Sequence, residues 1–228
     1  MRYAGIDKCD ICNGNDVGVS VFVQGCHFCC KGCFNKETWD FNGGKEWNEE
    51  IEKQFIELIS KPYIKRVSIL GGEPLADENL ELTFNIIALI YGVCEQYNRE
   101  IMVWIYTGYT FEKIYDIQNI DNNSAIYTFE KIYDIQNIDN NSAINPIIKW
   151  MSGKTQLSLD ESLSKSAQQW MRNTILKYCD YLVDGRFEID KQDLTYSKVK
   201  FAGSTNQRII DVQKTLEKGE IVLYEQNS

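Results

Sequence analysis

Histidine, proline and long apolar runs are scarce in this sequence, and each shortage excludes a class of protein. His27 is the single histidine of the 228 residues, so a zinc hydrolase site of the two-histidine H-E-x-x-H type is excluded. The longest apolar stretch, around residues 86–94, is far shorter than the roughly 18 residues that cross a bilayer. No apolar segment follows the basic residue at the start of the chain. We therefore expect a soluble, cytoplasmic protein without a membrane partner.

Basic charge and cysteine are also limited. The 24 Lys and Arg residues are outnumbered by 33 Asp and Glu residues, which leaves a net charge of -9. Such a surface repels a phosphate backbone, so we expect no nucleic-acid partner. Eight cysteines in 228 residues are too few for a small secreted disulfide scaffold. Because no Pro- or Gly-rich linker divides the chain, we predict a single domain over residues 1–228.

Strand and helix patterns alternate along the chain. A cysteine-rich loop over residues 25–35 follows the first predicted strand, and Gly71-Gly72 and Thr107-Gly108 follow the next two. Strands that alternate with helices form parallel sheets whose C-terminal ends share one edge, where ligands bind. We therefore predict an α/β fold with these three breaks on one edge. The predicted strands are residues 19–23, 65–70, 101–106, 181–183 and 221–224, and the predicted helices are residues 47–60, 77–98, 160–178 and 204–217.

An exact repeat interrupts this pattern. Residues 109–126 read YTFEKIYDIQNIDNNSAI, and residues 127–144 repeat them letter for letter. Two units are too few for a solenoid, which needs at least three. We therefore interpret the repeat as a tandem duplication tolerated as a surface insertion. A helical insertion of this length makes about five whole turns and keeps the apolar face in phase.

Four thiols lie within eight residues, Cys26-His27-Phe28-Cys29-Cys30-Lys31-Gly32-Cys33. As a zinc site, two C-x2-C pairs would supply four ligands, but such pairs are usually a dozen or more residues apart, and these two abut. As an iron-sulfur site, Cys26, Cys30 and Cys33 would hold three corners of a [4Fe-4S] cluster and leave the fourth iron open to a substrate or cofactor. His27 is interpreted as a polar loop residue.

The C-x3-C-x2-C spacing after a strand, followed by Gly71-Gly72-Glu73-Pro74 after the next, resembles the radical S-adenosylmethionine enzymes. That resemblance implies a partial (β/α) barrel in which Cys26, Cys30 and Cys33 hold the cluster. It implies that the amino and carboxylate groups of S-adenosylmethionine chelate the open iron, and that Gly71, Gly72 and Glu73 hold the methionine end. Glycines permit close approach of backbone to a ligand, and Glu73 could offset the ammonium charge.

Finer features are similar to the activating proteins of anaerobic ribonucleoside-triphosphate reductases. They are Gly32 and Phe34 on either side of Cys33, with YTGY at 106–109, VDGRF at 183–187 and GSTNQ at 203–207. The likeness spans residues 1–224 apart from the duplication and residues 145–166. It implies reductive cleavage of S-adenosylmethionine, a glycyl radical on the large subunit of the reductase, and a low-potential electron donor such as flavodoxin or ferredoxin. Gly32 and Phe34 would contact the adenine side.

Several alternatives stay open. One is an activase of another glycyl-radical enzyme, another is a small-molecule radical S-adenosylmethionine enzyme, and a third is a non-catalytic zinc or iron-sulfur protein. Cys9 and Cys12 form a second C-x2-C, but no partner pair at zinc spacing follows. Cys29 is expected to be a spare thiol, and Cys94 and Cys179 are expected to be buried as small apolar residues.

Overall fold

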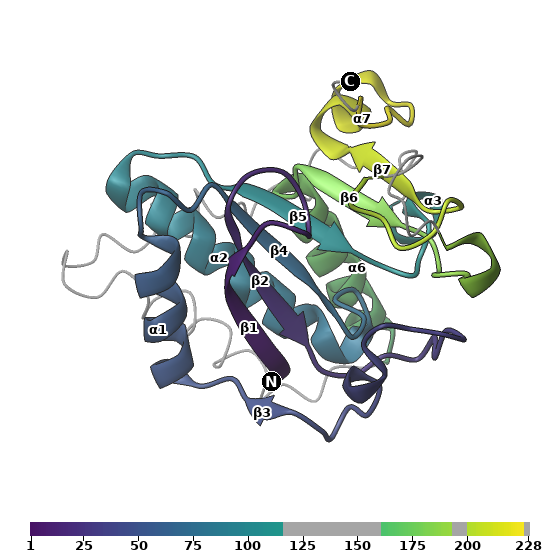
Figure 1. Ribbon diagram of the computed structural model, residues 1–228, viewed down its shortest axis with the longest axis horizontal. Helices are drawn as coiled ribbons and strands as arrows, with labels where there is room; N and C mark the ends of the chain where they lie inside the picture. The colour runs from purple at the N-terminus through teal and green to yellow at the C-terminus, as the bar shows by residue number, and fades with distance from the viewer. Residues whose placement is uncertain (116–160, 193–199, 226–228) are drawn as a thin grey trace.

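The computed structural model describes residues 1–115, 161–192 and 200–225. Their strands form one open sheet in the order β3-β1-β2-β4-β5-β6-β7 (Figure 1). The central strands β2, β4, β5 and β6 are parallel, whereas β1, β3 and β7 run antiparallel to their neighbours. The strands are β1 (Arg2–Asp10), β2 (Gly18–Val23), β3 (Lys45–Glu46), β4 (Arg66–Gly71), β5 (Met102–Tyr106), β6 (Tyr181–Asp184) and β7 (Arg208–Asp211).

Helices α1, α2 and α6 lie along one face of this sheet (Figure 1). Helix α1 starts where the Asn48 side chain accepts a hydrogen bond from the N–H of Ile51, which satisfies one free donor of the first turn. Helix α2 packs between α1 and α6 and is therefore buried around most of its circumference. The helices are α1 (Glu49–Ile59), α2 (Leu80–Tyr97), α3 (Phe111–Ile114), α6 (Glu161–Lys177) and α7 (Val212–Lys218), with 3-10 turns η1 (Lys36–Thr38), η2 (Asp77–Asn79) and η5 (Ile189–Lys191).

The main core lies between the sheet and these helices. Alternate residues of β2 and β4, namely Val19, Val21, Val23, Val67 and Ile69, are fully buried on the helix side. The parallel register Val19↔Val67 and Val21↔Ile69 puts them side by side. Because side chains alternate between the two faces of a strand, Ser20, Arg66 and Ser68 lie on the other side of the sheet, where they are also buried.

The other face carries a smaller, aromatic cluster. Trp104 of β5 is fully buried there and packs with Val183 and Ile209. Its ring lies 4.8 Å from that of Tyr181 and 5.8 Å from that of Tyr224, measured between centroids. Tyr224 therefore brings the C-terminal residues across this face of the sheet.

A buried arginine closes the N-terminal ends of the parallel strands. The fully buried guanidinium of Arg66 donates to the main-chain oxygens of Asp10, Asn13 and Asn15, at 2.8, 2.6 and 2.8 Å. It also donates to the Ser68 hydroxyl and to the Asp10 carboxylate. The loop between β1 and β2 is thus wrapped around one charge whose donors are satisfied, as burial requires.

Most predicted elements are confirmed. The strands predicted at 19–23, 65–70, 101–106 and 181–183 are β2, β4, β5 and β6. The helices predicted at 47–60, 77–98 and 160–178 are α1, η2 with α2, and α6. The shared edge of the parallel strands is confirmed with them.

Strands β1 and β3 were not predicted. Strand β1 contains Gly5 and several charged residues, and β3 pairs with it only at Arg2 and Tyr3. The helix predicted at 204–217 is wrong in its first half, because residues 208–211 form β7 against β6, and α7 starts only at Val212. A short apolar run such as Ile209-Ile210 does not distinguish strand from helix by periodicity. The strand predicted at 221–224 is reduced to a single bridge between Leu223 and Ile210.

The duplication is described only at its beginning. Residues 109–115 of the first copy include α3, with Phe111, Ile114 and Tyr115 buried. The rest of that copy, the whole second copy and residues 145–160 lie outside the described residues, so the predicted surface insertion is untested. No helix in the described part of the chain is long and apolar enough to cross a membrane.

Candidate functional site

Four loops meet where the parallel strands β2, β4, β5 and β6 end. The N–H of Gly72 donates to the oxygen of Val23 at 2.9 Å, and the N–H of Glu73 donates to that of Gly25 at 2.8 Å. These bonds join the loop after β4 to the loop after β2. The N–H of Gly185 donates to the oxygen of Tyr109 at 2.9 Å, which joins the loops after β6 and β5. All three sequence breaks predicted for this edge therefore lie together.

The cysteine loop places three half-buried thiols beside this edge. Cys26, Cys30 and Cys33 are each partly exposed. The N–H of Cys26 is held by the oxygen of Trp39 at 3.0 Å, and a turn brings the N–H of Cys33 to the oxygen of Cys30 at 3.1 Å. Cys29 is exposed, its φ is 45°, and its thiol contacts the oxygen of Cys26 at 3.6 Å. Cys29 is thus set apart from the three predicted ligands.

The electrostatic surroundings of these thiols are mixed. Burial, with smaller contributions from the nearby Glu73 and Cys30, raises the pKa of Cys26 to about 11. Burial also raises the pKa of Cys30, but the N–H of Phe187 and the charge of Arg186 favour its thiolate and oppose that increase. Without a metal the Cys26 thiol therefore stays protonated near neutral pH. Ligation by iron would displace the proton.

The three cysteines do not form a site for a single metal ion. Among the described residues, no three His, Cys, Asp or Glu side chains converge as ligands of a single ion. The three thiolates of a [4Fe-4S] site bind different iron atoms, so they surround a volume and do not converge on one point. The N–H of Asn35 contacts the sulfur of Cys33 at 3.4 Å, a bond of the kind that tunes cluster sulfurs. The sequence spacing of the three cysteines, their partial exposure and this hydrogen bond are compatible with a cluster.

The Gly71-Gly72 turn needs the absence of a side chain. A Cβ on Gly72 would lie 2.3 Å from the main-chain oxygen of Gly25, which is too close for any other residue. The side chain of Asn79 ties the same two loops, donating to the oxygens of Gly25 and Glu73 at 3.1 and 2.9 Å. The glycines therefore let the loop after β4 pack directly on the backbone that leads into the cysteines.

Glu73 is a buried carboxylate shared between two strands. Its oxygens accept from the hydroxyl of Thr107 at 2.7 Å, the N–H of Gly108 at 2.7 Å and the N–H of Leu75 at 2.9 Å. Burial raises the pKa of Glu73 to about 7, although these hydrogen bonds and the charge of Arg172 favour the ionised form. The carboxylate thus joins the ends of β4 and β5 and titrates near neutral pH.

Gly32 and Phe34 contact a segment that the sequence analysis did not place in the site. A Cβ on Gly32 would lie 2.7 Å from Cδ1 of Ile189. The Phe34 side chain is 63% exposed, and its ring centroid lies 5.0 Å from that of Phe187. Sequence reasoning used VDGRF only as a family likeness. Its position directly after a parallel strand could have placed Arg186 and Phe187 at this edge.

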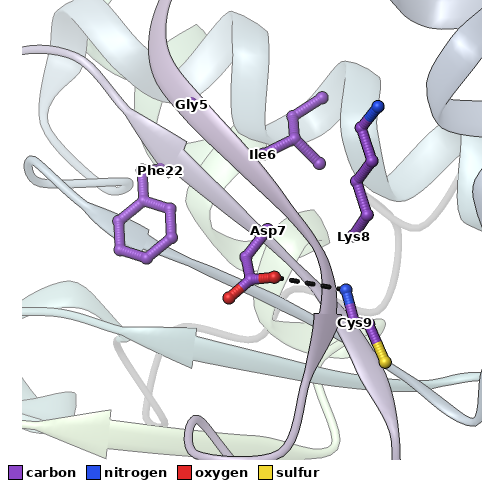
Figure 2. A pocket seen from close by; sticks show the side chains of 6 residues that line it. All are labelled: Gly5, Ile6, Asp7, Lys8, Cys9 and Phe22. Atoms are coloured by element: carbon purple, nitrogen blue, oxygen red, sulfur yellow. Dashed lines mark hydrogen bonds between the residues drawn. The ribbon is translucent and has the colours of Figure 1, made fainter.

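Cys9 and Cys12 lie away from this edge. They flank the end of β1, which is antiparallel to β2, so they are near the N-terminal ends of the parallel strands. Both are exposed. Residues 5–9 of β1 and Phe22 of β2 line an open depression of about 590 Å³. Figure 2 shows the side chains that line it, with the Asp7 side chain directed to the same side of β1 as Phe22. This depression holds none of the predicted ligands.

The sequence matches known proteins over most of its length. The family described as "4Fe-4S single cluster domain" matches residues 12–132 and 135–210. The chain is 32% identical over 118 residues to the anaerobic ribonucleoside-triphosphate reductase-activating protein of Enterobacteria phage T4, an alignment that covers 52% of this chain and 73% of that protein. The protein of the same name from Pasteurella multocida is 26% identical over 211 residues, covering 92% of this chain and 96% of the relative. That of Vibrio cholerae is 31% identical over 120 residues, covering 52% and 75%.

Proposed function

Because this chain belongs to the family of anaerobic ribonucleoside-triphosphate reductase-activating proteins and carries a 4Fe-4S single cluster domain, we propose that it generates a glycyl radical on such a reductase. The reduced cluster would supply one electron that cleaves bound S-adenosylmethionine, and the resulting adenosyl radical would take a hydrogen atom from the glycine. In this proposal the open sheet is the partial (β/α) barrel of radical S-adenosylmethionine enzymes.

The observation that carries this proposal is the contact between the cysteine loop and the Gly71-Gly72 turn. Two motifs that are far apart in sequence share one edge, joined by the hydrogen bonds from Gly72 and Glu73. We assign Cys26, Cys30 and Cys33 as the cluster ligands. Sites of this kind place the ligand across the C-terminal strand ends, where backbone groups approach it closely.

Gly71, Gly72 and Glu73 would hold the methionine end of S-adenosylmethionine. A carboxylate has room for about four hydrogen bonds, and Glu73 accepts three from the protein. A ligand ammonium group beside it would favour its ionised form and lower its pKa. Glu73 therefore has both the charge and the remaining acceptor capacity for this role.

Gly32 and Phe34 would contact the adenine side, because the exposed ring of Phe34 offers a flat apolar surface next to Cys33. The partner would be the large subunit of the anaerobic ribonucleoside-triphosphate reductase. A low-potential donor such as flavodoxin or ferredoxin would supply the electron. No side chain of this chain is needed as a general acid or base, since a hydrogen atom moves with its electron.

The test is anaerobic reconstitution with iron and sulfide, followed by reduction, addition of S-adenosylmethionine and measurement of 5′-deoxyadenosine. Cys26→Ala, Cys30→Ala and Cys33→Ala should each lose the oxygen-sensitive cluster and the product. Cys29→Ala is the matched control, because its thiol is exposed and turned to its own loop, and it should keep both.

Two results would reject this assignment. If Cys29→Ala loses the cluster while Cys30→Ala keeps it, the ligands are wrong. If protein purified without oxygen holds about one zinc ion and no iron, the site is a zinc knuckle. A glycyl radical signal in the reductase, observed by electron paramagnetic resonance only with the reconstituted chain, tests the partner separately.

A further inference from the structure

Residues 185–189, which follow β6, pack against the cysteine loop. The guanidinium of Arg186 lies over the Phe28 ring, 4.4 Å from its centre. Phe187 and Ile189 of the same segment meet Phe34 and Gly32 of that loop. A segment distant in sequence therefore contacts both neighbours of Cys33 and the aromatic residue between Cys26 and Cys30.

Phe28 is held between two loops at this point. Its ring lies 4.7 Å from that of Tyr109, nearly edge to face. A side chain on Gly108 would collide with the same ring, with a Cβ only 2.4 Å from Cδ2. Arg186 contacts the ring as a cation over an aromatic face, which is an attractive arrangement. The loop that carries Cys26, Cys29 and Cys30 is thus fixed through Phe28.

The backbone of Arg186 is itself held in place. The side chain of Asn206 donates to the oxygen of Arg186 at 2.9 Å, and the side chain of Gln207 donates to that of Gly185 at 2.9 Å. The hydroxyl of Ser204 accepts from the N–H of Glu188 at 3.2 Å. These hydrogen bonds hold the backbone of residues 185–188, and so they fix the position from which the Arg186 side chain reaches the cysteine loop.

The charge of Arg186 acts on a ligand position. It favours the thiolate of Cys30, together with the N–H of Phe187. Within the described residues, no carboxylate forms an ion pair with Arg186. Arg186 is exposed, so its charge is screened by solvent and not by a described ion pair, unlike that of Arg208, which pairs with Asp184 and Glu112.

We propose that Arg186 is a positioning residue that raises the reduction potential of the cluster, by holding a positive charge with no described ion-pair partner against the cysteine loop. The inference rests on the proposed function, in which Cys26, Cys30 and Cys33 are ligands. Three thiolates and an oxidised [4Fe-4S] core together carry one negative charge, and reduction by one electron from a low-potential donor adds a second. A nearby cation stabilises the reduced form more than the oxidised form and raises the potential.

The test uses Arg186→Met, which removes the charge and keeps the chain length, and Arg186→Lys, which keeps the charge and loses the planar group. Lys191→Met is the matched control, since it removes a positive charge from the same connection, where Lys191 pairs with Glu188 at 2.7 Å. Each variant is reconstituted without oxygen, its iron is measured, and its cluster is titrated by electron paramagnetic resonance without S-adenosylmethionine.

We expect Arg186→Met to lower the ratio of reduced to oxidised cluster about tenfold at the potential where the parent is half reduced, equivalent to about 59 mV for one electron. Arg186→Lys should lie close to the parent, and Lys191→Met should not differ from it. An unchanged potential in a fully loaded Arg186→Met protein would overturn the proposal. An equal change in Lys191→Met would overturn it as well, because the effect would then be one of net charge.

Loss of iron in Arg186→Met is also decisive when Arg186→Gln is added. If both neutral variants lose iron while Arg186→Lys holds it, the positive charge itself acts on the cluster, which supports the proposal. If all three variants lose iron, the role is structural and the proposal fails. Failure of the proposed function is distinct, since it would show as a parent protein without a cluster or a Cys30→Ala variant that keeps one.

Discussion

The two edges of the parallel strands treat their polar groups in opposite ways. At the N-terminal edge, Arg66 is fully buried and its donors are taken by Asp10, Ser68 and the loop after β1. At the C-terminal edge, three thiols are partly exposed and Arg186 stands over an aromatic ring without a described ion pair. At the N-terminal edge the polar groups are paired within the protein, whereas at the C-terminal edge the thiols and Arg186 are accessible to a ligand.

This contrast indicates that the paired groups of the N-terminal edge stabilise the fold, while the C-terminal edge is suited to binding a ligand. A buried charge with all its partners fixes the geometry of the loop around it, and it leaves nothing for a ligand to bind. Groups whose pKa is raised by burial, such as Cys26 and Glu73, are costly to hold in their charged forms. A bound ligand of opposite charge can offset this cost, and groups with strongly shifted pKa values are typical of functional sites.

The largest effect is expected at the N-terminal edge. Arg66→Met should destabilise the protein by about 3–5 kcal/mol, because it leaves the buried Asp10 carboxylate without its cation. Urea unfolding of the metal-free protein measures this loss. Arg99→Met is the control, since Arg99 donates only to the oxygens of residues 60, 61 and 64 and its removal strands no carboxylate. Equal losses in the two variants would contradict the interpretation of this edge.

A second prediction concerns a packed position behind the C-terminal edge. Phe111 is fully buried and its N–H binds Asp184, so Phe111→Ala should cost about 3–5 kcal/mol. Phe129 has the same neighbours in sequence, and Phe129→Ala leaves the pocket filled by Phe111 intact. We expect thermal unfolding to change only in the first variant. Similar losses in both would mean that the two copies share the pocket.

The third prediction uses the pH dependence of the C-terminal edge. The pKa of Glu73 is about 7 in the folded protein and about 4.5 in an unfolded chain, so the folded state binds the proton more tightly. Its contribution to the free energy of unfolding should therefore fall, by up to the order of 3 kcal/mol, as the pH rises from about 4.5 to about 7. Glu73→Gln should lack this fall.

Glu73→Gln also tests the cofactor role. Cluster assembly should be normal, but half-saturation with S-adenosylmethionine should need roughly ten- to a hundredfold more ligand, because one charged hydrogen bond is lost. If the free energy of unfolding depends on pH in the same way in the parent and in the variant, the titration of Glu73 does not affect stability and the third prediction is wrong. Unchanged affinity would remove Glu73 from the methionine site.

The smallest effect is expected from deleting one copy of the repeat. Removal of either copy gives the same protein, because residues 109–126 and 127–144 are identical. The first copy's buried residues are then still supplied, and the free energy of closing the connection before α6 changes by well under about 1 kcal/mol. Melting temperature and 5′-deoxyadenosine yield should match the parent. A lost cluster would show that the extra copy supports the site.

Much of the fold could be predicted, and the family resemblance drawn from the cysteine and Gly71-Gly72-Glu73 motifs is confirmed by the comparisons. The central strands are continuous apolar runs, because both of their faces are buried. Strands β1, β3 and β7 were missed, because β1 contains several charged residues and β3 and β7 are only two and four residues long. The assignments of Glu73 and Phe34 to the ligand remain predictions.

The sequence by itself determined the alternation of strands and helices, the family and the set of thiols, since these depend on local spacing and residue type. Only the tertiary structure decided which groups meet: Glu73 with Thr107 and Gly108, Arg66 with the loop after β1, and Arg186 with Phe28. These contacts join loops from different strands. No local pattern encodes them, because each depends on the order of strands in the sheet and on the burial that the packed sheet imposes.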